Sequence, residues 1–267
     1  MNFRILAIGD VVGKPGRRIV QQLLPALVRE RNIRFVVANA ENSAGGAGLT
    51  LETVEDLNKA GCHVLTCGDH VYDQREIIPY LDRNPKLLRP ANLSPEAAGR
   101  GWGVFELPEG VKVGVIHLMG RVFMAKPTDC PFRMATALVE KIRQETPVVL
   151  LDLHAEVTSE KIAMGWHLDG KASLVFGTHT HVQTADERIL PKGTAYITDV
   201  GMTGPHDGVL GRRADRVLAA FLTQMPHKFD VAEGDLRLSA VQVTVDSATG
   251  RALEIERLCL RGDAATA

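Results

Sequence analysis

Five short apolar segments of this 267-residue chain end directly in residues that can bind a metal ion. The segments are residues 4–10, 35–42, 64–70, 148–154 and 174–181. Continuous apolar runs of this length are typical of strands that are buried on both faces of a sheet. Because ligands bind outside the carboxyl ends of such strands, the five polar ends predict one shared site and favour a hydrolase.

The overall composition argues against several classes of partner. The chain is 45% hydrophobic and 24% charged, with a net charge of -1. There is therefore no excess of positive charge for wrapping nucleic acid or binding an anionic membrane. We expect no stable nucleic-acid partner, whereas a small charged substrate such as a nucleotide stays open.

The N-terminal residues enter a strand pattern at once, without the basic and apolar segments of a signal peptide. No apolar run approaches the roughly 18 residues that span a bilayer. We therefore expect a cytoplasmic protein that does not associate with membranes. Cys-x-x-Cys spacing is absent from the sequence, which favours free thiols at the four cysteines, Cys62, Cys67, Cys130 and Cys259.

Helical and strand patterns alternate along the first two thirds of the chain, and antiparallel strands follow His181. Pro25 is expected to kink or shorten the first helix, and Thr50 and Gly61 should bound the second. Further helices are expected at 74–81, 132–144, 159–164 and 214–222, and further strands at 103–107, 112–116, 188–190, 193–198, 236–245 and 253–258. We predict a single domain over residues 1–267, with two sheets packed face to face and helices outside.

The segment 177–181, Gly-Thr-His-Thr-His, is the sharpest local motif. In an extended strand, residues two apart point the same way, so His179 and His181 should face one cavity. Neutral imidazoles bind zinc, iron and manganese. The motif therefore predicts metal ligands at the end of the fifth apolar run.

The other four strand ends add carboxylate, amide and imidazole groups. With the two histidines they give seven candidate ligands: Asp10, Glu41, Asn42, Asp69, His154, His179 and His181. Seven are too many for one four-coordinate zinc ion and suit two ions that share a carboxylate. His70 could be a ligand, a turn residue or the general acid that protonates a leaving alkoxide.

Residues near these ends have alternative interpretations. Asp152 and Glu156 could orient a ligating histidine. His117 could touch a substrate, although a structural role at a strand end is favoured. Arg212 and Arg213 are most simply a solvated charged pair, and the glycine-rich loop 43–48 is interpreted as a flexible wall of the site.

The chain resembles the calcineurin-like metallophosphoesterases, and most closely their YmdB-like bacterial branch, over nearly its full length. The segments that carry the resemblance are 9–13, 39–42, 89–92, 154–161, 177–186 and 197–205. The resemblance implies an α/β fold, a four-layer α-β-β-α sandwich of two mixed sheets. It also implies hydrolysis of small phosphodiesters, 2′,3′-cyclic nucleotides in particular, by a hydroxide that bridges two iron or manganese ions.

The resemblance also implies a role for each site residue. Asp10, Asn42 and His181 would bind one ion, and Asp69, His154 and His179 would bind the other. Glu41 would bridge the two ions, and His70 would donate the proton. Zinc is compatible with the same donors.

Two positions depart from the wider superfamily. Val12 stands where a histidine is usual, as the YmdB-like branch implies, and the carbonyl oxygen of Asn42 can replace the lost ligand. Asp69 stands where asparagine is usual. With two divalent ions and a bridging hydroxide, Asp69 leaves the set of ligands neutral, whereas asparagine would leave one positive charge for an anionic diester. Asp69 is therefore expected to weaken diester affinity, unless one of the ions is trivalent.

Two other functions stay open at this point. One is a phosphomonoesterase such as a nucleotidase, which would use the same ions. The other is a regulatory protein that senses a nucleotide with slow turnover. His70 favours catalysis, since a sensor needs no acid beside a leaving group. The sequence leaves the oligomeric state open, a homo-oligomer included.

Overall fold

Strand β1 (Asn2–Ile8) buries side chains on both of its faces, as its apolar sequence predicts. Ile5 and Ala7 pack between the two sheets of the structure, whereas Leu6 and Ile8 pack beneath helices. Successive side chains of a strand point to opposite faces, which explains the alternation. In this computed structural model, which describes residues 1–262, the strand lies near the middle of the first sheet.

The first sheet has eight strands and is mixed. Its order is β2-β12-β13-β1-β3-β4-β5, with β14 paired to β13. β1, β3, β4 and β5 are parallel, whereas β13 is antiparallel to β1. The other strands are β2 (Asp10–Val11), β3 (Ile33–Asn39), β4 (Val64–Thr66), β5 (Leu87–Leu88), β12 (Met202–Pro205), β13 (Leu236–Asp246) and β14 (Ala252–Arg261).

The second sheet has six strands in the order β10-β11-β9-β8-β7-β6, and it is also mixed. β7, β8, β9 and β11 are parallel, and the edge strands β6 and β10 are antiparallel to their neighbours. The bounds are β6 (Trp102–Glu106), β7 (Lys112–Met119), β8 (Val149–His154), β9 (Leu174–Thr178), β10 (Arg188–Ile189) and β11 (Ala195–Ile197). The expectation that all strands after His181 are antiparallel is wrong for β11. The chain reverses direction between β9 and β10 and again between β10 and β11, so that β11 runs parallel to β9.

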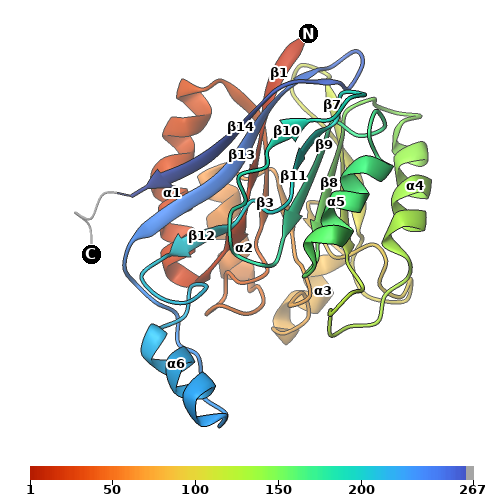
Figure 1. Cartoon of the computed structure of the whole chain (residues 1–267). Helices are drawn as coiled ribbons and strands as arrows, with labels where there is room; N and C mark the ends of the chain where they lie inside the picture. The colour runs from red at the N-terminus through yellow and green to blue at the C-terminus, as the bar shows by residue number, and fades with distance from the viewer. Residues whose placement is uncertain (263–267) are drawn as a thin grey trace.

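Helices cover the outer face of each sheet, and an apolar cluster fills the space between the sheets. Figure 1 shows α1 (Gly13–Glu30) and α2 (Leu51–Ala60) on one side, with α4 (Pro131–Ile142) and α5 (Thr158–His167) on the other. The remaining helices are the short η1 (Arg75–Ile77) and α3 (Ile78–Leu81), and α6 (Ala214–Thr223). The predicted four-layer α-β-β-α sandwich of two mixed sheets is confirmed. Among residues 1–262, no helix combines the length and apolar character needed to cross a membrane.

Two helix predictions have different outcomes. The Thr50 side chain accepts the Thr53 N–H at 3.3 Å, and Gly61 ends α2 in a left-handed conformation, so both predicted bounds are confirmed. Pro25 does not shorten α1, which continues to Glu30. Pro25 removes one hydrogen bond from the helix, because it has no backbone N–H. The buried side chains of Leu24 and Leu27, on either side of it, pack in the apolar cluster beneath the first sheet and stabilise the helix there.

Candidate metal centre

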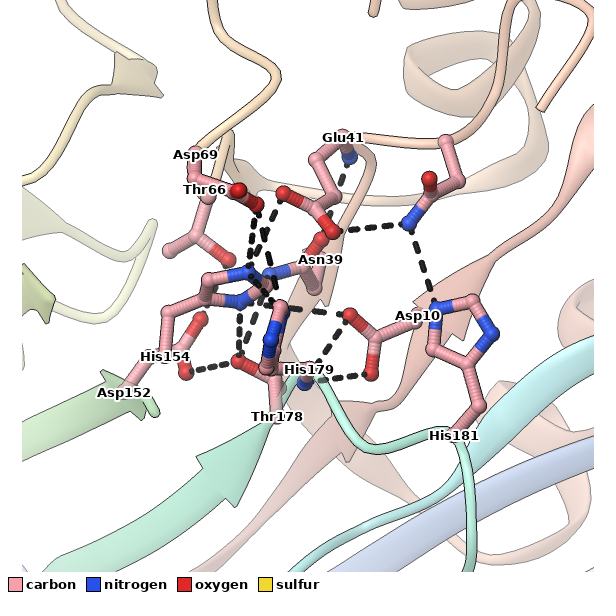
Figure 2. Close-up of polar contacts among 12 residues, drawn as sticks. Asp10, Asn39, Glu41, Thr66, Asp69, Asp152, His154, Thr178, His179 and His181 are labelled. Carbon is pink, nitrogen blue, oxygen red and sulfur yellow. Dashed lines mark hydrogen bonds and ion pairs between the residues drawn. The ribbon is translucent and has the colours of Figure 1, made fainter. Parts of the chain in front are cut away.

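The carboxyl ends of strands from both sheets meet at one place and bring the predicted ligands together. Asp10 follows β1, and Glu41 and Asn42 follow β3. Asp69 follows β4, His154 ends β8, and His179 and His181 follow β9. Figure 2 shows the side chains of the six labelled candidate ligands converging on one small region: Asp10, Glu41, Asp69, His154, His179 and His181. The prediction that separate strand ends share a single site therefore agrees with the structure.

The first group of candidate ligands consists of Glu41, Asp69, His154 and His179. Each offers one ligand atom, and these atoms lie within 4.8 Å of one another. The buried Nε2 of His154 lies 3.1 Å from Glu41 Oε2 and 3.2 Å from Asp69 Oδ1. His179 Nδ1 lies 3.0 Å from the same Nε2 atom. This arrangement can hold one metal ion.

The second group consists of Asp10, Glu41 and His181, and it overlaps the first at Glu41. Asn42 lies between two of its members, with the amide nitrogen 2.8 Å from Glu41 Oε1 and 3.3 Å from His181 Nε2. A half turn of the amide exchanges its nitrogen and oxygen, so Asn42 can offer the carbonyl oxygen to a cation. Two adjacent ions that share Glu41 fit the two groups.

The backbone at the two histidines differs from the expected extended strand. His179 has φ of 97° and His181 has φ of 63°, both in the left-handed region that favours glycine. The turn directs His179 into the first group and His181 into the second. The argument from strand alternation is therefore wrong, although both histidines reach the site.

Buried polar groups hold this turn in place. The Asp10 carboxylate accepts the His179 N–H at 3.1 Å, and Asp199 accepts the Thr180 hydroxyl at 2.7 Å. The Lys161 ammonium donates to the same oxygen of Asp199 at 2.6 Å, and both side chains are 1% exposed. The Lys161–Asp199 pair thus fixes the backbone between the two histidines and offsets its strain.

Lys161 and Asp199 are not among the site residues predicted from the sequence, although the sequence carries a signal for Asp199. Asp199 closely follows the apolar residues of β11 and is a sixth polar strand end. Lys161 lies in α5, and no strand pattern leads to it. Only the packing of α5 against β9 brings the two charges together.

The electrostatics of the site favour a bound cation. Burial raises the pKa of the Asp10 carboxyl well above its ordinary value, although the charge of His154 opposes the rise. Burial alone would lower the pKa of His154, but the Glu41 and Asp69 carboxylates raise it well above its ordinary value. Among residues 1–262, the ion pairs of these three carboxylates are all with histidine. Buried charges of one sign are usually paired or bound to a metal, so the donor set fits metal ions.

A hydrogen-bond network contacts His154 at Nδ1, the ring nitrogen that faces away from Glu41 and Asp69. Thr178 Oγ1 lies 2.9 Å from His154 Nδ1 and donates to Asp152 Oδ1 at 2.7 Å. Asp152 thus orients His154 through Thr178, a residue that the sequence did not single out. Glu156 acts more directly, since its Oε2 lies 3.1 Å from His179 Nε2. Both carboxylates fit the orienting roles expected for them.

His117 and Gly68 support the turn that carries Asp69. His117 is fully buried, and its Nε2 accepts the Gly68 N–H at 3.0 Å, which is the structural role that the sequence favours. Gly68 has φ of 49°, and a Cβ atom there would lie 1.8 Å from Glu41 Oε2. Glycine therefore allows the backbone to approach the shared carboxylate.

His70 lies beside the ligands but in neither group. Its backbone N–H donates to Glu41 Oε2 at 3.3 Å. Its side chain is 37% exposed, with Nδ1 2.7 Å from Asp73 Oδ2. The imidazole is therefore accessible, and Asp73 fixes its orientation.

Arg212 differs from the solvated residue expected from the sequence. It is half-buried and donates to the carbonyl oxygen atoms of Gly45 and Gly46. The prediction is wrong because the glycine-rich loop leaves carbonyl groups that need donors. The contact also ties Arg212 to the glycine-rich loop 43–48, which the sequence predicts to be a flexible wall of the site.

Comparison with known proteins agrees with this geometry. The family model described as "YmdB-like protein" matches residues 6–258. A Bacillus subtilis protein named 2′,3′-cyclic-nucleotide 2′-phosphodiesterase is 47% identical over 98% of this chain and 98% of its own.

Two solved structures are also similar. A protein of Thermus thermophilus is 39% identical with a TM-score of 0.91, over 98% of this chain and 100% of its own. A structure from Mycoplasma pneumoniae, described as a novel phosphatase, is 34% identical with a TM-score of 0.91, over 98% of this chain and 94% of its own.

Proposed function

Because the chain belongs to the YmdB-like protein family, we propose that it hydrolyses small phosphodiesters, with 2′,3′-cyclic nucleotides as the substrate class. The name of the Bacillus subtilis relative supports this choice of substrate. The observation that carries the proposal is the pair of metal-binding groups that overlap at Glu41. Paired ions that share a ligand are typical of enzymes that cleave phosphate esters.

The proposed division of ligands follows the two groups. Asp10, Asn42 and His181 would hold one ion, and Asp69, His154 and His179 would hold the other. Glu41 would be the shared ligand. When bound, such a pair supplies Lewis acidity toward the phosphate and generates a nucleophile from water at neutral pH. Iron or manganese is the proposed metal, and zinc is compatible with the same donors.

His70 is the proposed proton donor to the leaving oxygen. It lies outside both groups of ligands, and its backbone N–H contacts the shared carboxylate. The Asp73 carboxylate, 2.7 Å from Nδ1, would hold the ring in one orientation and leave Nε2 for proton exchange. Because the ring is partly exposed, it can regain a proton from solvent after each turnover.

The test is an assay of the metal-loaded protein against 2′,3′-cyclic nucleotides, linear dinucleotides and nucleoside monophosphates. We expect cleavage of the cyclic diesters, a loss of about 10²–10⁴-fold in kcat for His70→Ala, and loss of bound metal for Glu41→Gln. Activity that survives Glu41→Gln undiminished would show that Glu41 is not the shared ligand. Binding of cyclic nucleotides without turnover would instead support a nucleotide sensor.

A phosphomonoesterase is the second candidate, because the similar Mycoplasma pneumoniae structure is described as a phosphatase. The same ligands would serve both reactions. A higher kcat/KM for nucleoside monophosphates than for cyclic diesters would favour this alternative.

A further inference from the structure

The loop between β7 and α4 carries an aromatic ring in an unusual setting. Phe123 is 86% exposed, and its φ of 61° lies in the left-handed region. Burying a phenylalanine side chain stabilises a fold, and a left-handed backbone is strained for a residue other than glycine. Neither core packing nor backbone preference accounts for a phenylalanine here. Such outliers often mark functional sites.

The start of this loop is hydrogen-bonded to the backbone of His154 and to helix α5. The Gly120 N–H donates to the carbonyl oxygen of His154 at 2.9 Å. The buried Glu160 carboxylate, on α5, accepts the N–H groups of Arg121 at 3.1 Å and Val122 at 3.3 Å. The backbone is therefore fixed up to the residue that precedes Phe123.

The second half of the loop is attached to another ligand-bearing turn. The half-buried Lys126 ammonium donates to the carbonyl oxygen of Asp69 and lies 5.9 Å from the centre of the Tyr72 ring. Phe123 lies three positions from both Gly120 and Lys126, a span of at most about 11 Å. The backbone at Phe123 thus lies close to the two segments that carry His154 and Asp69, and its ring is exposed beside them.

We propose that the Phe123 ring stacks on the base of the nucleotide whose phosphate is bound at the metal centre. This inference rests on the proposed function and extends it to the nucleoside part of the substrate. Stacking of a base on an aromatic side chain is worth about 1–3 kcal/mol and tolerates every base, because each has a π face. The site should accordingly accept cyclic nucleotides with little preference for one base.

The experiment compares two substrates that differ only in the base. They are adenosine 2′,3′-cyclic phosphate and methyl riboside 2′,3′-cyclic phosphate. We expect Phe123→Ala to raise KM for the adenosine compound by about 5- to 150-fold, with kcat unchanged. The kinetics of the base-free compound should not change, and Phe123→Trp should keep the wild-type KM.

Phe221 offers a matched control. It is 78% exposed and lies on α6, which projects from the body of the molecule in Figure 1. Phe221→Ala should leave the kinetics of both substrates unchanged. An equal effect of Phe123→Ala on the two substrates, or no effect on either, overturns the proposal.

A binding measurement separates this inference from the proposed function. If the wild type cleaves neither substrate, the proposed function fails, and calorimetry with adenosine 3′-monophosphate and methyl riboside 3-phosphate decides the role of Phe123. Tighter binding of the adenosine compound that is lost in Phe123→Ala supports stacking. Equal affinities for the two ligands overturn it.

Discussion

The Thr178 hydroxyl holds the buried imidazole of His154 in one orientation. Thr178 Oγ1 lies 2.9 Å from His154 Nδ1, and its own proton is donated to Asp152 at 2.7 Å. The oxygen therefore accepts a hydrogen bond from Nδ1–H, which leaves Nε2 as the nitrogen that can bind a metal ion. That atom faces Glu41 and Asp69, as a metal ligand would.

Replacement of Thr178 by valine should weaken metal binding without removing a ligand. Valine has a similar shape but cannot accept the hydrogen bond from Nδ1–H, so the contact that orients His154 is lost. Groups that orient a ligating histidine typically contribute 10- to 100-fold, or about 1.4–2.8 kcal/mol, to metal affinity. Competition with a chelator measures the change, and Thr178→Ser should keep wild-type affinity. Equal affinity of the valine and serine variants would show that the hydroxyl has no such role.

Asp69→Asn should raise kcat/KM for a diester anion. The substitution leaves one more positive charge among the ligands, and asparagine can still offer a carbonyl oxygen. We expect an increase of about tenfold, equivalent to about 1.4 kcal/mol of transition-state stabilisation. Asp215→Asn, which removes an exposed charge on α6, should have no effect. A decrease in kcat/KM with a full complement of metal would contradict the charge argument.

The convergence of these strand ends could be predicted from the sequence because its signal is local. An apolar run buried on both faces predicts a strand, and the residue after it must lie at the carboxyl end of the sheet. Asp10, Glu41, Asp69 and His154 all follow from this rule. Two sheets packed face to face with helices outside also follow from the pattern of strands and helices, and the family resemblance adds that both sheets are mixed. The single domain over residues 1–267 stays a prediction.

The parts that could not be predicted depend on contacts between distant segments. His179 and His181 reach different groups through left-handed turns, and strand alternation gives no hint of such turns. Lys161 is 38 residues from Asp199, and a lysine in a helix normally indicates a solvated face. Only packing of the two sheets and α5 brings these groups together, so periodicity within one segment cannot reveal them.

Lys161→Met should strongly destabilise the protein. Methionine leaves the Asp199 carboxylate buried without its cation, and loss of one partner of a buried ion pair typically costs about 3–5 kcal/mol. Urea denaturation, after a chelator has removed any bound metal, measures the free energy of unfolding. Lys59→Met is the matched control, because Lys59 pairs with Glu55 on the surface and is 76% exposed. We expect Lys59→Met to change the free energy of unfolding by less than about 0.5 kcal/mol. A similar small loss for Lys161→Met would contradict a structural role for the pair.

His63 should make the protein less stable as the pH falls. Its Nδ1 accepts the Val36 N–H at 3.1 Å, and its ring stacks on Phe35 with centroids 5.3 Å apart. Burial lowers the pKa of His63, and the positive charge of Lys86 adds to the effect. The folded protein therefore binds fewer protons at this ring than the unfolded chain does. The neutral ring of His63 contributes stability at neutral pH. This contribution is lost as the pH falls below about 6.5, the pKa of histidine in the unfolded chain.

The measurement compares wild type with His63→Asn, since asparagine can accept the same N–H and does not titrate in this range. Urea denaturation at pH 7.5 and pH 5 gives the free energy of unfolding of each protein. Because the other histidines titrate in both proteins, the difference between the two isolates His63. We expect wild type to lose stability relative to the variant on acidification, and a constant difference between the two pH values would contradict the assigned role.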